Sequence, residues 1–165
     1  MSETETLIPS ANIEWGKALE LDLAFMDNTH QEFIELLVKT QTASDDELLD
    51  QFDAMLQHTV DHFGAEDRWM RDTQFSSSNC HTMQHSVVLQ VMQEGLRRGR
   101  EGDLALIRQM ANELGIWFPQ HAQSMDAALA LHLRRVAYDE ATGEVLNPDE
   151  LPKTEITGCG GSSCS

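Results

Sequence analysis

Seven side chains able to bind a metal ion lie in four segments that read as helices, and this pattern constrains the fold more than any other feature. Three segments carry a pair of such side chains, and the first carries a single histidine. Helices that each direct ligands to one centre build the metal sites found inside four-helix bundles. The seven residues are His30, His62 with Glu66, His81 with His85, and His121 with Asp126.

Apolar periodicity and capping signals place the four helices. Ser44 followed three residues later by Glu47 is a capping signal for the second helix, and Asp103 can cap the fourth. Short connections between long helices predict antiparallel neighbours, so we expect an all-α, up-down-up-down four-helix bundle. The helices are expected over about residues 24–42, 45–72, 79 or 80 to 100, and 104–138.

Segments outside the bundle are expected at both ends. Residues 1–23 form an N-terminal arm, residues 24–138 the bundle, and residues 139–165 a polar tail that we expect to be flexible. The tail contains Cys159 and Cys164. These cysteines could form a disulfide, a thiol relay or a soft-metal clip. The alternative is an unstructured tail with incidental thiols. The residues available to dock the arm are Ile13, Trp15, Leu19, Leu21 and Leu23.

Composition excludes several classes of partner. The 165 residues carry a formal net charge of −17, a surface that repels nucleic acid and anionic membranes. The sequence contains no apolar run near the roughly 20 residues of a membrane span, and its start does not resemble a secretory signal. We therefore expect a cytoplasmic monomer. Its three cysteines, an odd number, argue against a disulfide framework.

The ligand count favours two metals over one. Residues four apart share a helical face, so His62 with Glu66 and His81 with His85 can each aim at one centre. His121 and Asp126 are five apart, which an α-helix separates by about 140°, so both should not point straight inward. Seven ligands exceed the roughly four of a zinc site. Two metals bridged by Glu66 and Asp126 would leave one metal with an open position, and imidazole with carboxylate suits iron.

Two other histidines are interpreted as structural. His58 also has ligand spacing to His62, but His62 is preferred because its partner Glu66 supplies a bridging carboxylate. His132 is expected to be a hydrogen-bonded residue of the core or its boundary, and Cys80 a small buried residue.

Taken in order, these motifs resemble the hemerythrin family, specifically its single-domain bacterial members, over roughly residues 13–133. The resemblance implies a di-iron centre that binds dioxygen reversibly at the open iron. It implies that His81, His85 and His121 bind one iron, that His30 and His62 bind the other, and that Glu66 and Asp126 bridge them. The matching motifs are Trp15, Asp27-Asn-Thr-His30, His62-Phe-x-x-Glu66-x-x-x-Met70, His81-x-x-x-His85 and Trp117-x-x-x-His121-x-x-x-x-Asp126.

The resemblance also implies that Phe63, Trp117 and Phe118 wall the dioxygen pocket and exclude water. This chain departs from the family pattern in three places. Ala122 stands where the family usually has a bulky aliphatic residue, which predicts a roomier pocket. Pro119 lies inside the fourth helix and should kink it. The cysteine-containing tail is not part of the usual domain.

Three functions follow from these expectations. The first is reversible dioxygen binding for transport, storage or sensing, with dioxygen as the partner. The second is a redox enzyme that acts on peroxide or nitric oxide, with electrons from a redox partner passing through the tail cysteines. The third is iron storage or repair, the least favoured because the site is buried and rich in imidazole. We expect an oxygen-binding protein rather than an enzyme.

Replacing Ala122 by Ile should slow autoxidation of the oxygenated protein. The larger side chain would narrow the pocket that Ala122 enlarges, and so would hinder the entry of water and small ligands. The decay rate of the oxygenated absorption band in air measures the effect. An unchanged rate would show that Ala122 does not set the size of the pocket.

Overall fold

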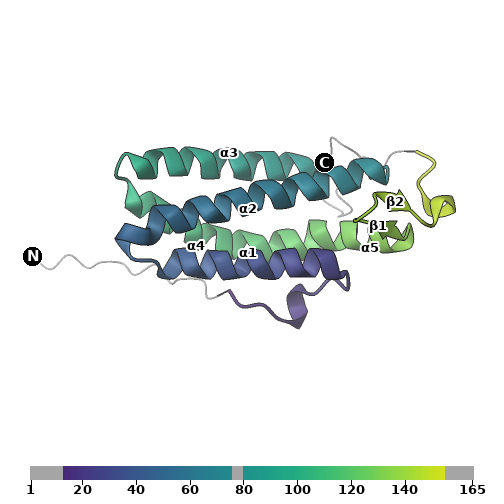
Figure 1. Ribbon diagram of the computed structural model, residues 1–165, viewed down its shortest axis with the longest axis horizontal. Coiled ribbons are helices and arrows are strands. Elements are labelled where there is room, and N and C mark those ends of the chain that lie inside the picture. Colours follow the sequence, from purple (N-terminus) through teal and green to yellow (C-terminus); the bar gives the residue numbers. More distant parts are fainter. Residues whose placement is uncertain (1–12, 76–79, 155–165) are drawn as a thin grey trace, which may run out of the picture.

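The computed structural model describes residues 13–75 and 80–154, and four long segments dominate it (Figure 1). Consecutive helices run in opposite directions, α1 packs against α2 and α4, and α3 packs against α2 and α4. The predicted up-down-up-down bundle is confirmed. The segments are α1 (Ala24–Thr42), α2 (Asp45–Asp72), α3 (Cys80–Arg100) and α4 (Leu104–His121), which continues through the π-helix η2 (Ala122–Asp126) into α5 (Ala127–Arg135).

The helix starts lie where the sequence predicts them. Asp103 caps α4, and its carboxylate accepts a hydrogen bond from the Leu106 backbone N–H at 3.2 Å. Ser44 occupies the N-cap position of α2, but its hydroxyl bonds the Glu47 carboxylate at 3.3 Å and not a backbone N–H. The fourth segment contains Pro119 within α4, and the helix continues past it to His121.

The apolar core consists of two separate clusters. The larger cluster includes Phe33 of α1 and Ala122 of η2. The smaller cluster includes Met26 of α1 and Leu129 of α5. On α1, His30 lies between Met26 and Phe33 in sequence, so the candidate ligands occupy the level of the bundle between the two clusters. A polar layer therefore divides the apolar core.

The N-terminal arm docks against the bundle as predicted. Ile13, Leu19 and Leu21 are buried, and Lys17–Leu19 form the short 3-10 helix η1. The Asp27 carboxylate accepts hydrogen bonds from the backbone N–H groups of Leu21 at 2.8 Å and Leu23 at 3.3 Å. Asp27 thus connects the arm to the start of α1. Residues 1–12 lie outside the described part of the chain.

The segment after α5 is folded further than the sequence predicts. A hairpin pairs β1 (Tyr138–Asp139) with β2 (Glu144–Val145), and a 3-10 helix η3 (Pro148–Glu150) follows at the same end of the bundle (Figure 1). Tyr138, Val145 and Leu151 pack on the smaller apolar cluster, and the Tyr138 hydroxyl donates to Asp72 at 2.8 Å. These few apolar contacts correct the expectation of a tail without structure from residue 139.

In the described ranges, the helices lack any stretch that is both long and apolar enough to cross a membrane.

Two glycines within helices should respond oppositely to replacement by alanine. A Cβ atom on Gly99 would lie 2.8 Å from Ile107 Cγ1 and from Leu49 Cδ2, whereas one on Gly64 would meet nothing within 4 Å. Gly99→Ala should therefore lower the free energy of unfolding by about 1–3 kcal/mol through overpacking. Gly64→Ala should raise it by roughly 0.5–1 kcal/mol, because alanine favours the helix.

Chemical denaturation of the two variants beside the unaltered protein measures both effects. Equal stability of the two variants would contradict the close approach of α2, α3 and α4 at Gly99.

Candidate metal centre

All seven predicted ligand residues lie in one buried group at the middle of the bundle. Each of the four long segments contributes, and every one of the seven residues is at most 4% exposed. α1 supplies one histidine, α2 a histidine and a glutamate, α3 two histidines, and the α4–η2 segment a histidine and an aspartate. They are His30, His62, Glu66, His81, His85, His121 and Asp126.

The pairs four residues apart converge as helical geometry predicts. His62 Nε2 lies 2.8 Å from Glu66 Oε1 on α2. The rings of His81 and His85 on α3 have centroids 4.5 Å apart. Both pairs therefore direct their polar atoms toward the centre of the bundle.

The pair five residues apart converges through a local change of helix type. η2 is a π-helix over Ala122–Asp126, in which the Ala127 N–H donates to the Ala122 carbonyl. Because π-helical bonds join residues i and i+5, residues five apart lie on the same side. His121 Nε2 and Asp126 Oδ1 are accordingly 3.1 Å apart. The expectation that the two side chains could not both point inward is wrong, because it assumed α-helical geometry.

Each carboxylate divides its two oxygens between two groups of histidines. Glu66 Oε1 lies 2.8 Å from His62 Nε2, whereas Glu66 Oε2 lies 3.3 Å from His85 Nε2. Asp126 Oδ2 lies 3.1 Å from His30 Nε2, whereas Asp126 Oδ1 lies 2.9 Å from His81 Nε2 and 3.1 Å from His121 Nε2. Both carboxylates therefore stand between the same two sets of imidazoles.

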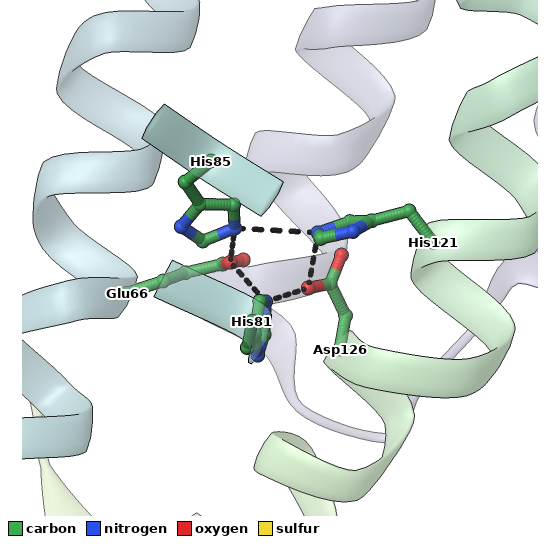
Figure 2. A group of neighbouring side chains, drawn as sticks. All are labelled: Glu66, His81, His85, His121 and Asp126. Carbon is green, nitrogen blue, oxygen red and sulfur yellow. Dashed lines mark hydrogen bonds and ion pairs between the residues drawn. The ribbon is translucent and has the colours of Figure 1, made fainter. Parts of the chain in front are cut away.

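The two groups each have the composition of a metal site. One contains Glu66, His81, His85, His121 and Asp126, with ligand atoms within 4.8 Å of one another (Figure 2). The other contains His30, His62 and the same two carboxylates. The histidines are thus divided three and two, and the carboxylates are shared.

The hydrogen bonding of the group fits bound cations. Among the described residues, the Nε2 atoms of His30 and His81, Glu66 Oε2 and both Asp126 oxygens are buried without a hydrogen-bond partner. Buried polar atoms are normally hydrogen-bonded. Atoms that lie 2.9–3.5 Å from one another but do not form hydrogen bonds are directed at common centres, as ligand atoms are.

Electrostatics in the metal-free group favour positive charge at His30 and His81. Burial opposes the charged imidazolium of His30 and His81, but the carboxylates of Asp126 and Glu66 raise the pKa of each to about 10. Burial by itself would also raise the pKa values of Glu66 and Asp126, yet the surrounding histidines hold both well below their usual values. Two buried carboxylates thus retain cations, which are protons when no metal is bound.

Three of the four residues predicted for the dioxygen pocket pack against ligand rings. Phe63 stacks on His85 with centroids 3.9 Å apart, and Trp117 stacks on His121 with centroids 4.5 Å apart. Phe118 instead meets the His30 ring edge-on at 5.2 Å. Ala122 is fully buried in the larger apolar cluster. Aromatic rings therefore pack against both sets of histidines.

His58 and His132 lie outside both metal-binding groups. His58 Nε2 lies 3.1 Å from the exposed carboxylate of Glu32, and His132 Nε2 donates to the Thr73 carbonyl at 2.9 Å. Cys80, which precedes His81, is half-buried and disulfide-bonded. Cys159 and Cys164 lie outside the described residues.

Sequence reasoning missed two residues that hold ligand rings. Asp67 Oδ1 lies 2.8 Å from His85 Nδ1, and Gln84 Oε1 lies 2.8 Å from His121 Nδ1. The partners are 18 and 37 residues apart in the chain, and neither pair has a spacing that marks it.

Comparisons with known proteins agree with this geometry. The family model described as "Hemerythrin HHE cation binding domain" matches residues 21–132. The chain is similar to a protein named Bacteriohemerythrin from Ralstonia nicotianae (strain ATCC BAA-1114 / GMI1000). The two are 37% identical over 121 residues, which cover 73% of this chain and 88% of that protein. A search of solved structures found no significant match.

The metal-free protein should lose stability as the pH rises from about 6.5 to about 10. The pKa values of His30 and His81 rise to about 10 on folding from an ordinary value of 6.5. Their stabilising contribution is therefore complete below pH 6.5 and is lost as the pH passes through 10. Thermal unfolding of chelator-treated protein across this range measures the loss.

Protein loaded with Zn²⁺ is the control, because bound metal replaces these protons and should reduce the decline. A melting temperature of the metal-free protein that stays level across the same range would contradict the prediction.

Proposed function

The chain belongs to the hemerythrin family, and from this premise we propose that it is a non-haem di-iron protein that binds dioxygen reversibly. The observation that carries the proposal is the division of the Glu66 and Asp126 oxygens between two sets of histidines. A single metal would use such carboxylates on one side only. Shared carboxylates support two metals held side by side.

The two irons have unequal sets of proposed ligands. His81, His85 and His121 would hold one iron, and His30 and His62 the other, with Glu66 and Asp126 bridging both. Imidazole with carboxylate suits iron among the common metals. An iron held by His30 and His62 would have one protein ligand fewer and so would have room for a small exogenous ligand. Two irons bound here would supply the electrons and the open coordination position that dioxygen binding requires.

The surrounding side chains suit a reversible ligand site. Phe118 meets His30 edge-on and packs on Phe33 with centroids 4.8 Å apart, which gives the two-histidine side an apolar wall. Phe33 and Phe118 are at most 2% exposed. An apolar wall limits the access of water and protons, and so slows irreversible oxidation of the centre.

We propose transport, storage or sensing as the physiological use of dioxygen binding. The alternative is a redox enzyme that acts on peroxide or nitric oxide with electrons passed through Cys159 and Cys164. Both cysteines lie outside the described residues, so this alternative stays a prediction.

A visible absorption spectrum tests the proposal. The iron-loaded protein would be reduced without air, exposed to dioxygen and then returned to argon. We expect a charge-transfer band that forms with dioxygen and disappears under argon. Irreversible passage to the oxidised spectrum would favour the redox enzyme, and the absence of any band would overturn the di-iron assignment.

A matched pair of variants on α2 sharpens the test. His62→Ala removes a proposed ligand and should abolish the reversible band. His58→Ala removes a histidine four residues earlier that bonds the Glu32 carboxylate and belongs to neither metal-binding group of the described residues. His58→Ala should retain the band. If His58→Ala lost the band and His62→Ala retained it, the iron ligand would be His58 and not His62.

A further inference from the structure

The five candidate histidine ligands differ in whether a neighbouring side chain supports the ring by a hydrogen bond at Nδ1. His85 Nδ1 lies 2.8 Å from the Asp67 carboxylate, and His121 Nδ1 lies 2.8 Å from the Gln84 side-chain oxygen. Among the described residues, the Nδ1 atoms of His30, His62 and His81 are buried without a partner. Both supported rings belong to the three-histidine group, and neither ring of the two-histidine group is supported.

The hydrogen bonds at Nδ1 determine which ring nitrogen faces the centre of the group. A carboxylate or amide oxygen accepts a hydrogen bond from Nδ1–H, which leaves Nε2 as the nitrogen that faces the centre. The two Nε2 atoms of His85 and His121 lie 3.3 Å apart and point into the same group (Figure 2). The rings therefore hold the orientation needed for metal binding before any ion is bound.

Aromatic packing restricts the same two rings on their faces. Phe63 is nearly parallel to His85, with an interplanar angle of 7°, and Trp117 is stacked on His121 at 26°. Each ring is thus held at its edge by a hydrogen bond and on its face by an aromatic side chain. The two contacts together leave the imidazoles of His85 and His121 little freedom to rotate.

The two supports differ in chemistry. Asp67 offers a negatively charged acceptor, whereas Gln84 offers a neutral one. A charged acceptor forms the stronger hydrogen bond and increases the basicity of the imidazole more. Asp67 follows the shared ligand Glu66 on α2, and Gln84 of α3 reaches across to α4. The supports therefore also connect α2 to α3 and α3 to α4 at this level of the bundle.

We propose that Asp67 and Gln84 preorganise the three-histidine position, so that it takes up metal first and holds it more tightly than the two-histidine position. Asp67 and Gln84 are positioning residues, which act through His85 and His121, and Asp67 has the larger effect. This inference rests on the proposed two-metal centre. It explains why one part of a shared site is held rigidly while the other is left adaptable.

Stepwise addition of Zn²⁺ to the metal-free protein tests the order of binding. Side-chain NMR signals of the histidines report which rings are occupied at each step. The first equivalent should shift the signals of His85 and His121, and the second those of His30 and His62. Occupation of His30 and His62 first, or of all rings together, would overturn the proposed order.

Variants at position 67 test the role of the carboxylate. Competition with a chromophoric chelator should show that Asp67→Ala weakens the first Zn²⁺ step about 10–100-fold, the usual effect of removing a residue that orients a ligand. The second step should change much less. Asp67→Asn should recover part of the loss, because its side-chain oxygen still accepts the hydrogen bond. Asp50→Asn, an exposed charge removal on the same helix, should leave both steps unchanged.

The outcomes distinguish the proposed two-metal centre from the proposed role of Asp67. Uptake of a single Zn²⁺ by the unaltered protein would end the two-metal proposal. Uptake of two ions with an unchanged first step in Asp67→Ala would end only the inference about Asp67. An equal loss in both steps would show that Asp67 maintains the fold of the bundle and does not position one ligand.

Discussion

The burial of two carboxylates at the centre of the bundle is the constraint on which the remaining structure depends. Glu66 and Asp126 are fully buried, and an ionised carboxylate inside a protein is stable only beside compensating positive charge. Five imidazoles surround them, and these can carry protons or leave their nitrogens free for metal. The carboxylates also explain why the apolar core is divided, since the layer that contains them cannot be filled with apolar side chains. The fold is stable because this layer is neutralised internally.

The aromatic residues and the polar supports complement each other around this layer. On the three-histidine side, Phe63 and Trp117 lie against ligand rings whose outer nitrogens are bonded to Asp67 and Gln84. On the two-histidine side, Phe118 forms the wall, and the Nδ1 atoms of His30 and His62 have no hydrogen-bond partner among the described residues. A rigid half and an adaptable half therefore share the same bridging carboxylates. Such a division suits a centre in which one metal stays fully coordinated while the other accepts and releases a ligand.

Much of the fold can be predicted from the sequence because its signals are local. Helix limits follow from capping residues such as Asp103, and ligand pairs four residues apart follow from α-helical geometry. The missing details depend on non-local or irregular structure. The partners of Asp67 and Gln84 are distant in the chain, so spacing does not reveal them. The hairpin after α5 depends on a few apolar residues such as Tyr138 within a polar segment. The convergence of His121 with Asp126 requires a π-helix, which a pattern based on 3.6 residues per turn does not anticipate.

The π-helix also fixes the direction of every residue that follows it. If Ala122–Asp126 took up α-helical geometry at unchanged length, everything beyond the segment would rotate by about 100°. The rotation would turn Asp126 away from the ligand group and would turn Leu129 and Leu133 of α5 away from the apolar cluster that buries them. Loss of the wide turn would therefore disrupt the ligand group and the core together. Removal of one residue from the segment has the opposite effect, because a histidine and an aspartate four apart share one face of a continuous α-helix. The spacing of this ligand pair and the type of helix that presents it must therefore change together.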